Sequence, residues 1–150
     1  MKILFLDFDG VINPLLNFSG TGDFSKIACS HIQMMLTKVP DLRIVVSSSW
    51  RTYGLPACRD ILKRNGIDST KVIDTTEGPK EKHGNKFERD HHVANWLKAH
   101  PEIDSFVIID DEAEFPDFKH KYVKPNAYVG FTQRDMEKAL SILGSDSKLH

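Results

Sequence analysis

Two pairs of aspartates are the residues whose types and spacing indicate chemistry. Asp7 and Asp9 end an apolar run at the start of the chain, and Gly10 follows at once. Asp110 and Asp111 end a second apolar run far along the chain. A lone aspartate in such a place usually caps a turn. Doubled acids after two apolar runs instead indicate acid–base or metal chemistry.

The elements that must position these acids alternate along the chain. Short apolar runs predict buried strands at 2–7, 42–46, 71–74 and 105–110, with a short fifth strand from 121–123 and 127–129. Amphipathic stretches predict helices at 25–39, 55–65, 87–100 and 132–143. This alternation predicts an α/β fold, a Rossmann-like three-layer sandwich around a central parallel sheet. The apolar stripe expected to face the core in the first helix is Ile27, Ile32, Met35, Leu36 and Val39.

Length and composition set the context for this fold. The 150 residues predict one domain over 1–143, with a frayed tail at 144–150. The net charge of -1 gives no basic field that would indicate tight binding to nucleic acid or to an anionic membrane. Two cysteines without metal spacing, no signal-like segment and no apolar run of membrane-spanning length favour a cytoplasmic protein.

The parallel sheet predicts where the polar residues meet. Ligands of open parallel sheets bind beyond the carboxyl ends of the strands. Three of the expected strands end there in polar groups, namely Asp7 with Asp9, Ser47, and Asp110 with Asp111. Four carboxylates in one crevice raise one another's pKa values unless a cation is present. All-oxygen ligation with open water positions suits Mg²⁺, which we therefore expect as the cofactor.

Several of these motifs together resemble a known superfamily. DFDGV after the first strand, Ser47 after the second, a cationic residue before a helix and IIDD after the fourth strand resemble the haloacid dehalogenase (HAD) superfamily over about residues 3–143. More narrowly, SSSWR, RDHHVANWL, IIDDE and the GFT segment resemble the small HAD domains of multi-domain RNA-repair proteins. The motif spacing leaves no room for a separate cap domain. The crevice is therefore expected to be open, unless residues 13–23 act as a lid.

This resemblance implies a role for each acid. Asp7 would be the nucleophile that forms an aspartyl-phosphate, and Asp9 would protonate the leaving oxygen and then activate water. The metal would be held by Asp7, by the backbone carbonyl of Asp9 and by Asp110. Asp111 would assist through water or coordinate the metal itself.

The resemblance also implies partners for the phosphoryl group. Ser47 would donate a hydrogen bond to a phosphoryl oxygen, and Gly10 would let the backbone turn sharply beneath it. The third motif of the family needs a cation opposite the nucleophile. Arg89 is favoured for that position, and Lys86 is the alternative.

Three residues after Ser47 have less specific assignments. Ser48 is a candidate substrate-binding residue, or it caps the following turn. Arg51 would contact a substrate phosphate, or it is simply solvated. Trp50 is expected to be a packing residue more than a substrate platform.

We therefore expect a Mg²⁺-dependent HAD-type phosphatase, acting on a nucleotide or polynucleotide terminal phosphate. The alternatives are a phosphatase of a small metabolite or phosphoprotein, and a binding domain that kept the fold and lost activity. The partner implied is a phosphorylated substrate, with a nucleic-acid end favoured and no membrane. The sequence leaves the oligomeric state open.

Overall fold

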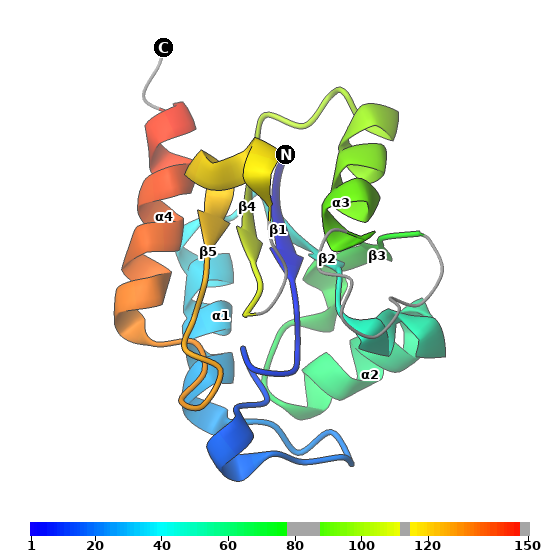
Figure 1. Ribbon diagram of the computed structural model, residues 1–150, viewed down its shortest axis with the longest axis vertical. Coiled ribbons are helices and arrows are strands. Elements are labelled where there is room, and N and C mark those ends of the chain that lie inside the picture. The colour runs from blue at the N-terminus through cyan, green and yellow to red at the C-terminus, as the bar shows by residue number, and fades with distance from the viewer. Residues whose placement is uncertain (78–87, 112–114, 148–150) are drawn as a thin grey trace.

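A five-stranded parallel sheet forms the centre of the fold, in the order β3-β2-β1-β4-β5. The computed structural model describes residues 1–77, 88–111 and 115–147. The middle strand is β1, and the chain moves outward from it in both directions (Figure 1). The strands are β1 (Lys2–Leu6), β2 (Leu42–Val46), β3 (Val72–Thr75), β4 (Ser105–Ile109) and β5 (Tyr122–Val123).

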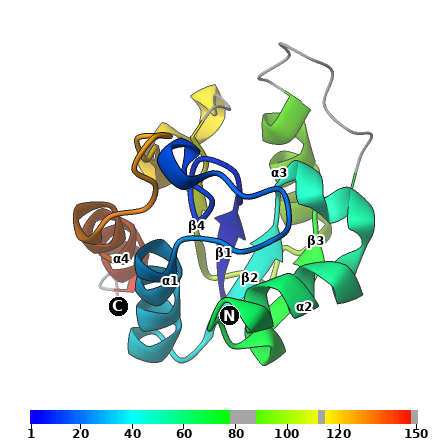
Figure 2. The same ribbon diagram turned by 90° about the horizontal axis from the view of Figure 1, so that it is seen from below.

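Helices cover both faces of this sheet and make three layers (Figure 2). One face carries α1 (Lys26–Lys38), α2 (Leu55–Arg64) and α4 (Gln133–Ser147), and the other carries α3 (Glu88–Ala99). Alternate residues of β1 serve the two layers, since Leu4 and Leu6 pack in the first cluster while Ile3 and Phe5 pack in the second. The sheet is thus buried on both faces, which explains why its strands are almost continuously apolar.

The structure confirms the α/β architecture, and no separate cap domain is present among the described residues. β2 covers the expected residues, and β1 and β4 end one residue before the expected limit. Helix α1 begins after Ser25, whose hydroxyl accepts a hydrogen bond from the Ala28 backbone N–H. Within the described residues, no helix combines the length and the apolar character needed to cross a membrane.

Two details of the expected core and sheet are wrong. Ile27 is 71% exposed, because the first turn of α1 buries Ala28 and Cys29 instead. Residues 127–129 form a turn between Asn126 and Gly130 and add no strand. Pro125 lies just beyond β5 and has no N–H to donate, so it does not extend the ladder.

Helix α4 continues through Gly144 to Ser147, into the segment that the sequence predicted as a tail. A glycine inside a helix costs only about 1 kcal/mol relative to alanine, which is too little to end a well-packed helix. Ala139 and Leu143 anchor this helix in the core. Residues 148–150 lie outside the described part of the chain.

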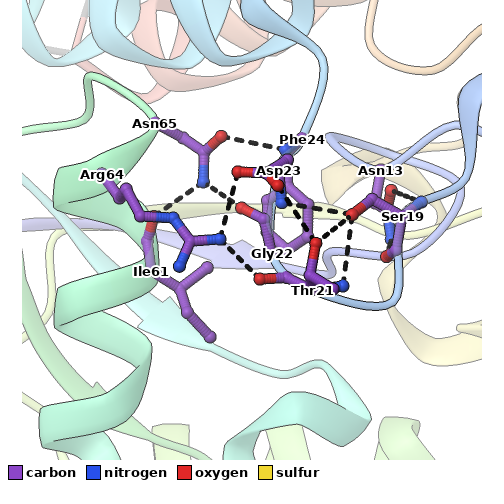
Figure 3. Close-up of polar contacts among 9 residues, drawn as sticks. All are labelled: Asn13, Ser19, Thr21, Gly22, Asp23, Phe24, Ile61, Arg64 and Asn65. Atoms are coloured by element: carbon purple, nitrogen blue, oxygen red, sulfur yellow. Dashed lines mark hydrogen bonds and ion pairs between the residues drawn. The ribbon is translucent and has the colours of Figure 1, made fainter.

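The loop between β1 and α1 is attached to the end of α2 (Figure 3). The Asn65 amide accepts from the Phe24 backbone N–H at 2.9 Å and donates to the Gly22 carbonyl at 2.7 Å. Arg64 contacts the Asp23 carboxylate at 3.3 Å. These contacts hold the far end of the segment that the sequence offered as a lid.

Candidate active site

The acids of the first and last motifs meet where β1 and β4 lie side by side. Leu6 pairs with Ile109 in the sheet register, so that the next residues, Asp7 and Asp110, leave the sheet together. The Asp7 backbone N–H donates to the Ile109 carbonyl at 3.1 Å. The strand order reverses at this pair, and open α/β sheets bind their ligands at such a switch point.

Three carboxylates form a cluster at this point. Asp7, Asp110 and Asp111 each offer an oxygen, and these atoms lie within 4.8 Å of one another. Asp7 and Asp110 are buried, and Asp111 is half-buried. Burial raises the pKa of Asp7 well above its usual range, the charge of Asp110 raises it further, Arg89 opposes the shift, and Asp111 adds to it.

Arg89 is the cation that the structure places on this cluster. One guanidinium nitrogen, Nη1, lies 3.0 Å from Asp7 Oδ2 and 2.6 Å from Asp110 Oδ2. Arg89 lies in the first turn of α3, and its side chain is 13% exposed. The alternative cation, Lys86, lies outside the described residues.

The composition of the cluster fits a hard divalent cation. Among the described residues, three carboxylates lie together beside the Arg89 guanidinium, and two of them are buried. Every candidate ligand is a carboxylate oxygen, the donor type that Mg²⁺ prefers. Asp7, Asp110 and Asp111 are therefore the side chains that would hold the ion.

Gly10 makes room for the cluster. Its φ is +78°, a conformation that residues with a Cβ rarely adopt, and a Cβ there would overlap the Asp111 carboxylate. The turn that contains Gly10 is tight, because the Phe8 carbonyl accepts hydrogen bonds from the backbone N–H groups of Val11, Ile12 and Asn13. Gly10 is thus required by both the turn and the space that Asp111 occupies.

Two buried hydroxyl groups lie at the same edge of the sheet as the acid cluster. Ser47 follows β2, and its backbone N–H donates to the Leu6 carbonyl at 3.0 Å. Its Oγ is buried and has no hydrogen-bond partner among the described residues, and the same is true of Thr76 Oγ1 after β3. A buried hydroxyl without a partner costs about 1–3 kcal/mol, which a bound ligand would remove. The sequence interpretation missed Thr76, whose place one residue beyond a strand was the available signal.

Asp9 is turned away from the three clustered acids. Its Oδ1 accepts from Trp50 Nε1 at 3.0 Å and from Asn13 Nδ2 at 2.9 Å. The sequence interpretation treated Trp50 as packing alone and did not consider Asn13. The available signals were the place of Trp50 beside Ser47–Ser49 and the four-residue spacing from Asp9 to Asn13.

The remaining two candidates have structural partners. Ser48 Oγ accepts from the Trp50 backbone N–H at 3.2 Å, which confirms the capping alternative for Ser48. Arg51 is only 5% exposed, so its solvated alternative is wrong. Its Nη2 lies 3.4 Å from His92 Nδ1, in the interior between η2 (Ser49–Tyr53) and α3.

The parallel sheet with acids after β1 and β4 defines an α/β domain of the HAD type, a superfamily whose members are generally hydrolases. A family model described as the HAD domain in Swiss Army Knife RNA repair proteins matches residues 3–136. The chain therefore belongs to this family of small HAD domains. Comparisons with curated proteins and with solved structures gave no match.

The buried acid cluster predicts that Asp7→Asn stabilises the protein in chelator at pH 7. Because burial raises the pKa of Asp7 in the folded protein, the carboxyl group stabilises the fold only while it is protonated. This stabilisation is fully present below the ordinary value of 3.8 and is lost as pH rises through the folded-state pKa. The stability gained by Asp7→Asn should therefore vanish in acid and grow toward neutral pH. Urea unfolding across this pH range measures it.

Asp68→Asn is the matched control, because hydrogen bonds from Thr70 lower the pKa of Asp68 and removing its charge should bring no gain. Added Mg²⁺ at a hundred times its Kd should stabilise the wild type by about 2.7 kcal/mol. A stability loss in Asp7→Asn at neutral pH, or equal stabilisation of both proteins by Mg²⁺, would contradict the assignment.

Proposed function

We propose that this protein is a Mg²⁺-dependent phosphomonoesterase that acts through an aspartyl-phosphate on a nucleotide or polynucleotide terminal phosphate. The observation that carries the proposal is the cluster of Asp7, Asp110 and Asp111 with Arg89 across two of its members. A cation held by these acids, with an anionic substrate beside it, would give the buried cluster a chemical use.

Asp7 is the proposed nucleophile. Its Oδ1 accepts from the Phe8 backbone N–H at 2.9 Å and its Oδ2 contacts Arg89, so the carboxylate is fixed in orientation. A fixed nucleophile loses little entropy on approaching phosphorus. When bound, Mg²⁺ would offset the charge of the phosphate and keep Asp7 ionised.

Ser47 and Arg89 are the proposed partners of the phosphoryl group. The Ser47 hydroxyl is buried and unpartnered among the described residues, and it is thus available to donate to a phosphoryl oxygen. Arg89 is held by two carboxylates, and its positive charge is fixed beside the nucleophile. Such preorganised donors stabilise charge that develops in the transition state.

Asp9 is the proposed general acid and base. It is half-buried and held two residues from Asp7, outside the three-acid cluster. It would give a proton to the leaving oxygen and then take one from the water that hydrolyses the aspartyl-phosphate. The backbone carbonyl of Asp9 remains a proposed metal ligand beside the carboxylates of the cluster.

Three observations favour a nucleic-acid end as the substrate. The matched family is described by its RNA-repair proteins, and no separate cap domain encloses the site among the described residues. Tyr53 is 70% exposed, and its ring lies 5.7 Å from that of Trp50, which contacts Asp9. An exposed aromatic ring so near the site offers a stacking surface for a base.

Phosphate release from matched substrates tests this proposal. The panel is an oligonucleotide with a 3′-phosphate, one with a 5′-phosphate, mononucleotides and an aryl phosphate, each with Mg²⁺ and with chelator. We expect turnover of an oligonucleotide end that needs Mg²⁺ and falls by at least about 10⁴-fold in Asp7→Asn, since the nucleophile is gone.

Asp41→Asn is the control, because Asp41 is exposed and lies just before β2, at the opposite end of that strand from the site. It should keep wild-type rates. Turnover of mononucleotides or the aryl ester alone would keep the mechanism and remove the nucleic-acid substrate. No release from any ester would favour the binding-domain alternative.

A further inference from the structure

We propose that Trp50 and Asn13 are positioning residues that aim the proton-transferring oxygen of Asp9. This inference rests on the proposed function and adds to it how the general acid is oriented. The indole and the amide both donate to Oδ1 of Asp9, at 3.0 Å and 2.9 Å. Every hydrogen bond that described residues make with this carboxylate ends on Oδ1, which leaves Oδ2 for the proton.

The position of the Trp50 ring does not depend on Asp9. Its centroid lies 5.4 Å from that of Phe24, 5.7 Å from that of Tyr53 and 6.3 Å from that of Phe8. Its backbone N–H is bound by the Ser48 hydroxyl. The indole nitrogen is a donor only, so the rigid ring fixes one oxygen of Asp9 as an acceptor.

The Asn13 amide is fixed by the loop that follows it. Asn13 is fully buried, and its Oδ1 accepts from the Ser19 backbone N–H at 3.0 Å, while its Nδ2 also donates to the Ser19 carbonyl at 2.8 Å. The far end of the same loop is attached to α2 through Asn65 (Figure 3). The amide therefore presents its NH₂ group to Asp9.

These bonds matter because Asp9 transfers a proton in both half-reactions. In the first, the Asp7 carboxylate bonds to phosphorus, the ester P–O bond breaks, and Asp9 Oδ2 gives its proton to the leaving oxygen. In the second, Asp9 Oδ2 takes a proton from a water molecule while the water oxygen bonds to phosphorus and the bond between Asp7 and phosphorus breaks. Asp9 ends protonated, as it began. Indole and amide groups transfer no proton here, so their part is orientation.

Trp50→Phe tests this role, because it removes the indole N–H and keeps an aromatic ring. We compare kcat/KM, which reports the half-reaction that expels the leaving group, for an alkyl phosphate and for nitrophenyl phosphate. Nitrophenolate leaves with little proton assistance. We expect kcat/KM of Trp50→Phe to fall by about 10–100-fold for the alkyl ester, which is part of the 10²–10⁴-fold that a general acid contributes. For the aryl ester we expect kcat/KM to fall by less than about 3-fold.

The chain offers a matched control in its other tryptophan. Trp96 Nε1 donates to Asp74 Oδ2 at 2.7 Å, between α3 and β3, so Trp96→Phe removes the same kind of bond elsewhere. It should leave the ratio of the two kcat/KM values unchanged. Asn13→Ala should reproduce the Trp50→Phe ratio.

The outcomes separate this inference from the proposed function. An equal loss for both esters in Trp50→Phe and in Asn13→Ala, or no loss in either, would overturn the positioning role while the wild-type activity stands. Wild-type protein that releases phosphate from neither ester would overturn the proposed function, and the inference would fall with it. If Trp50→Phe does not fold, Asn13→Ala measured against Trp96→Phe decides the matter.

Discussion

Asp7, Asp110 and Asp111 bring three like charges together at the buried ends of β1 and β4, where little water is present to screen them. Burial raises the pKa of Asp7, the charge of Asp110 raises it further, and the attraction to Arg89 opposes both. Much of the surrounding structure serves the cluster. The register of two strands aligns the acids, Gly10 leaves space for one of them, and the first turn of α3 supplies the guanidinium. Removing Arg89 would leave the buried carboxylates without this compensating charge, so these features depend on one another.

The fourth acid has a different environment. Asp9 leaves the cluster and joins a set of aromatic and amide groups from the loops after β1 and β2. Two neighbouring aspartates thereby acquire different surroundings, one suited to nucleophilic attack beside a cation and one suited to proton transfer. One site can carry out both kinds of chemistry when its two carboxylates have different environments. The division of roles follows from these partners, because Trp50 and Asn13 bind Asp9 while Asp7 lies with Asp110 and Asp111.

Much of this arrangement could be predicted, because strand periodicity and motif position are local properties. The runs ending in Asp7 and Asp110 identified two neighbouring strands and therefore the cluster. Other features depend on packing, as the exposure of Ile27 shows. The sequence favoured Arg89 over Lys86 without settling the choice, because the two cations are only three residues apart and the start of a helix is uncertain by a residue or two. The bond between Trp50 and Asp9 spans 41 residues, so no local spacing predicts it, and the place of Trp50 beside Ser47–Ser49 was the available signal.

Mass spectrometry of the acid-quenched enzyme during turnover with Mg²⁺ tests most directly whether Asp7 attacks phosphorus. We expect one phosphoryl group on the peptide that contains Asp7, formed in the wild type and absent from Asp7→Asn. Phosphate release with no phosphoryl group on the protein would contradict it, because water would then attack the substrate directly. A phosphoryl group on any other residue would contradict it as well.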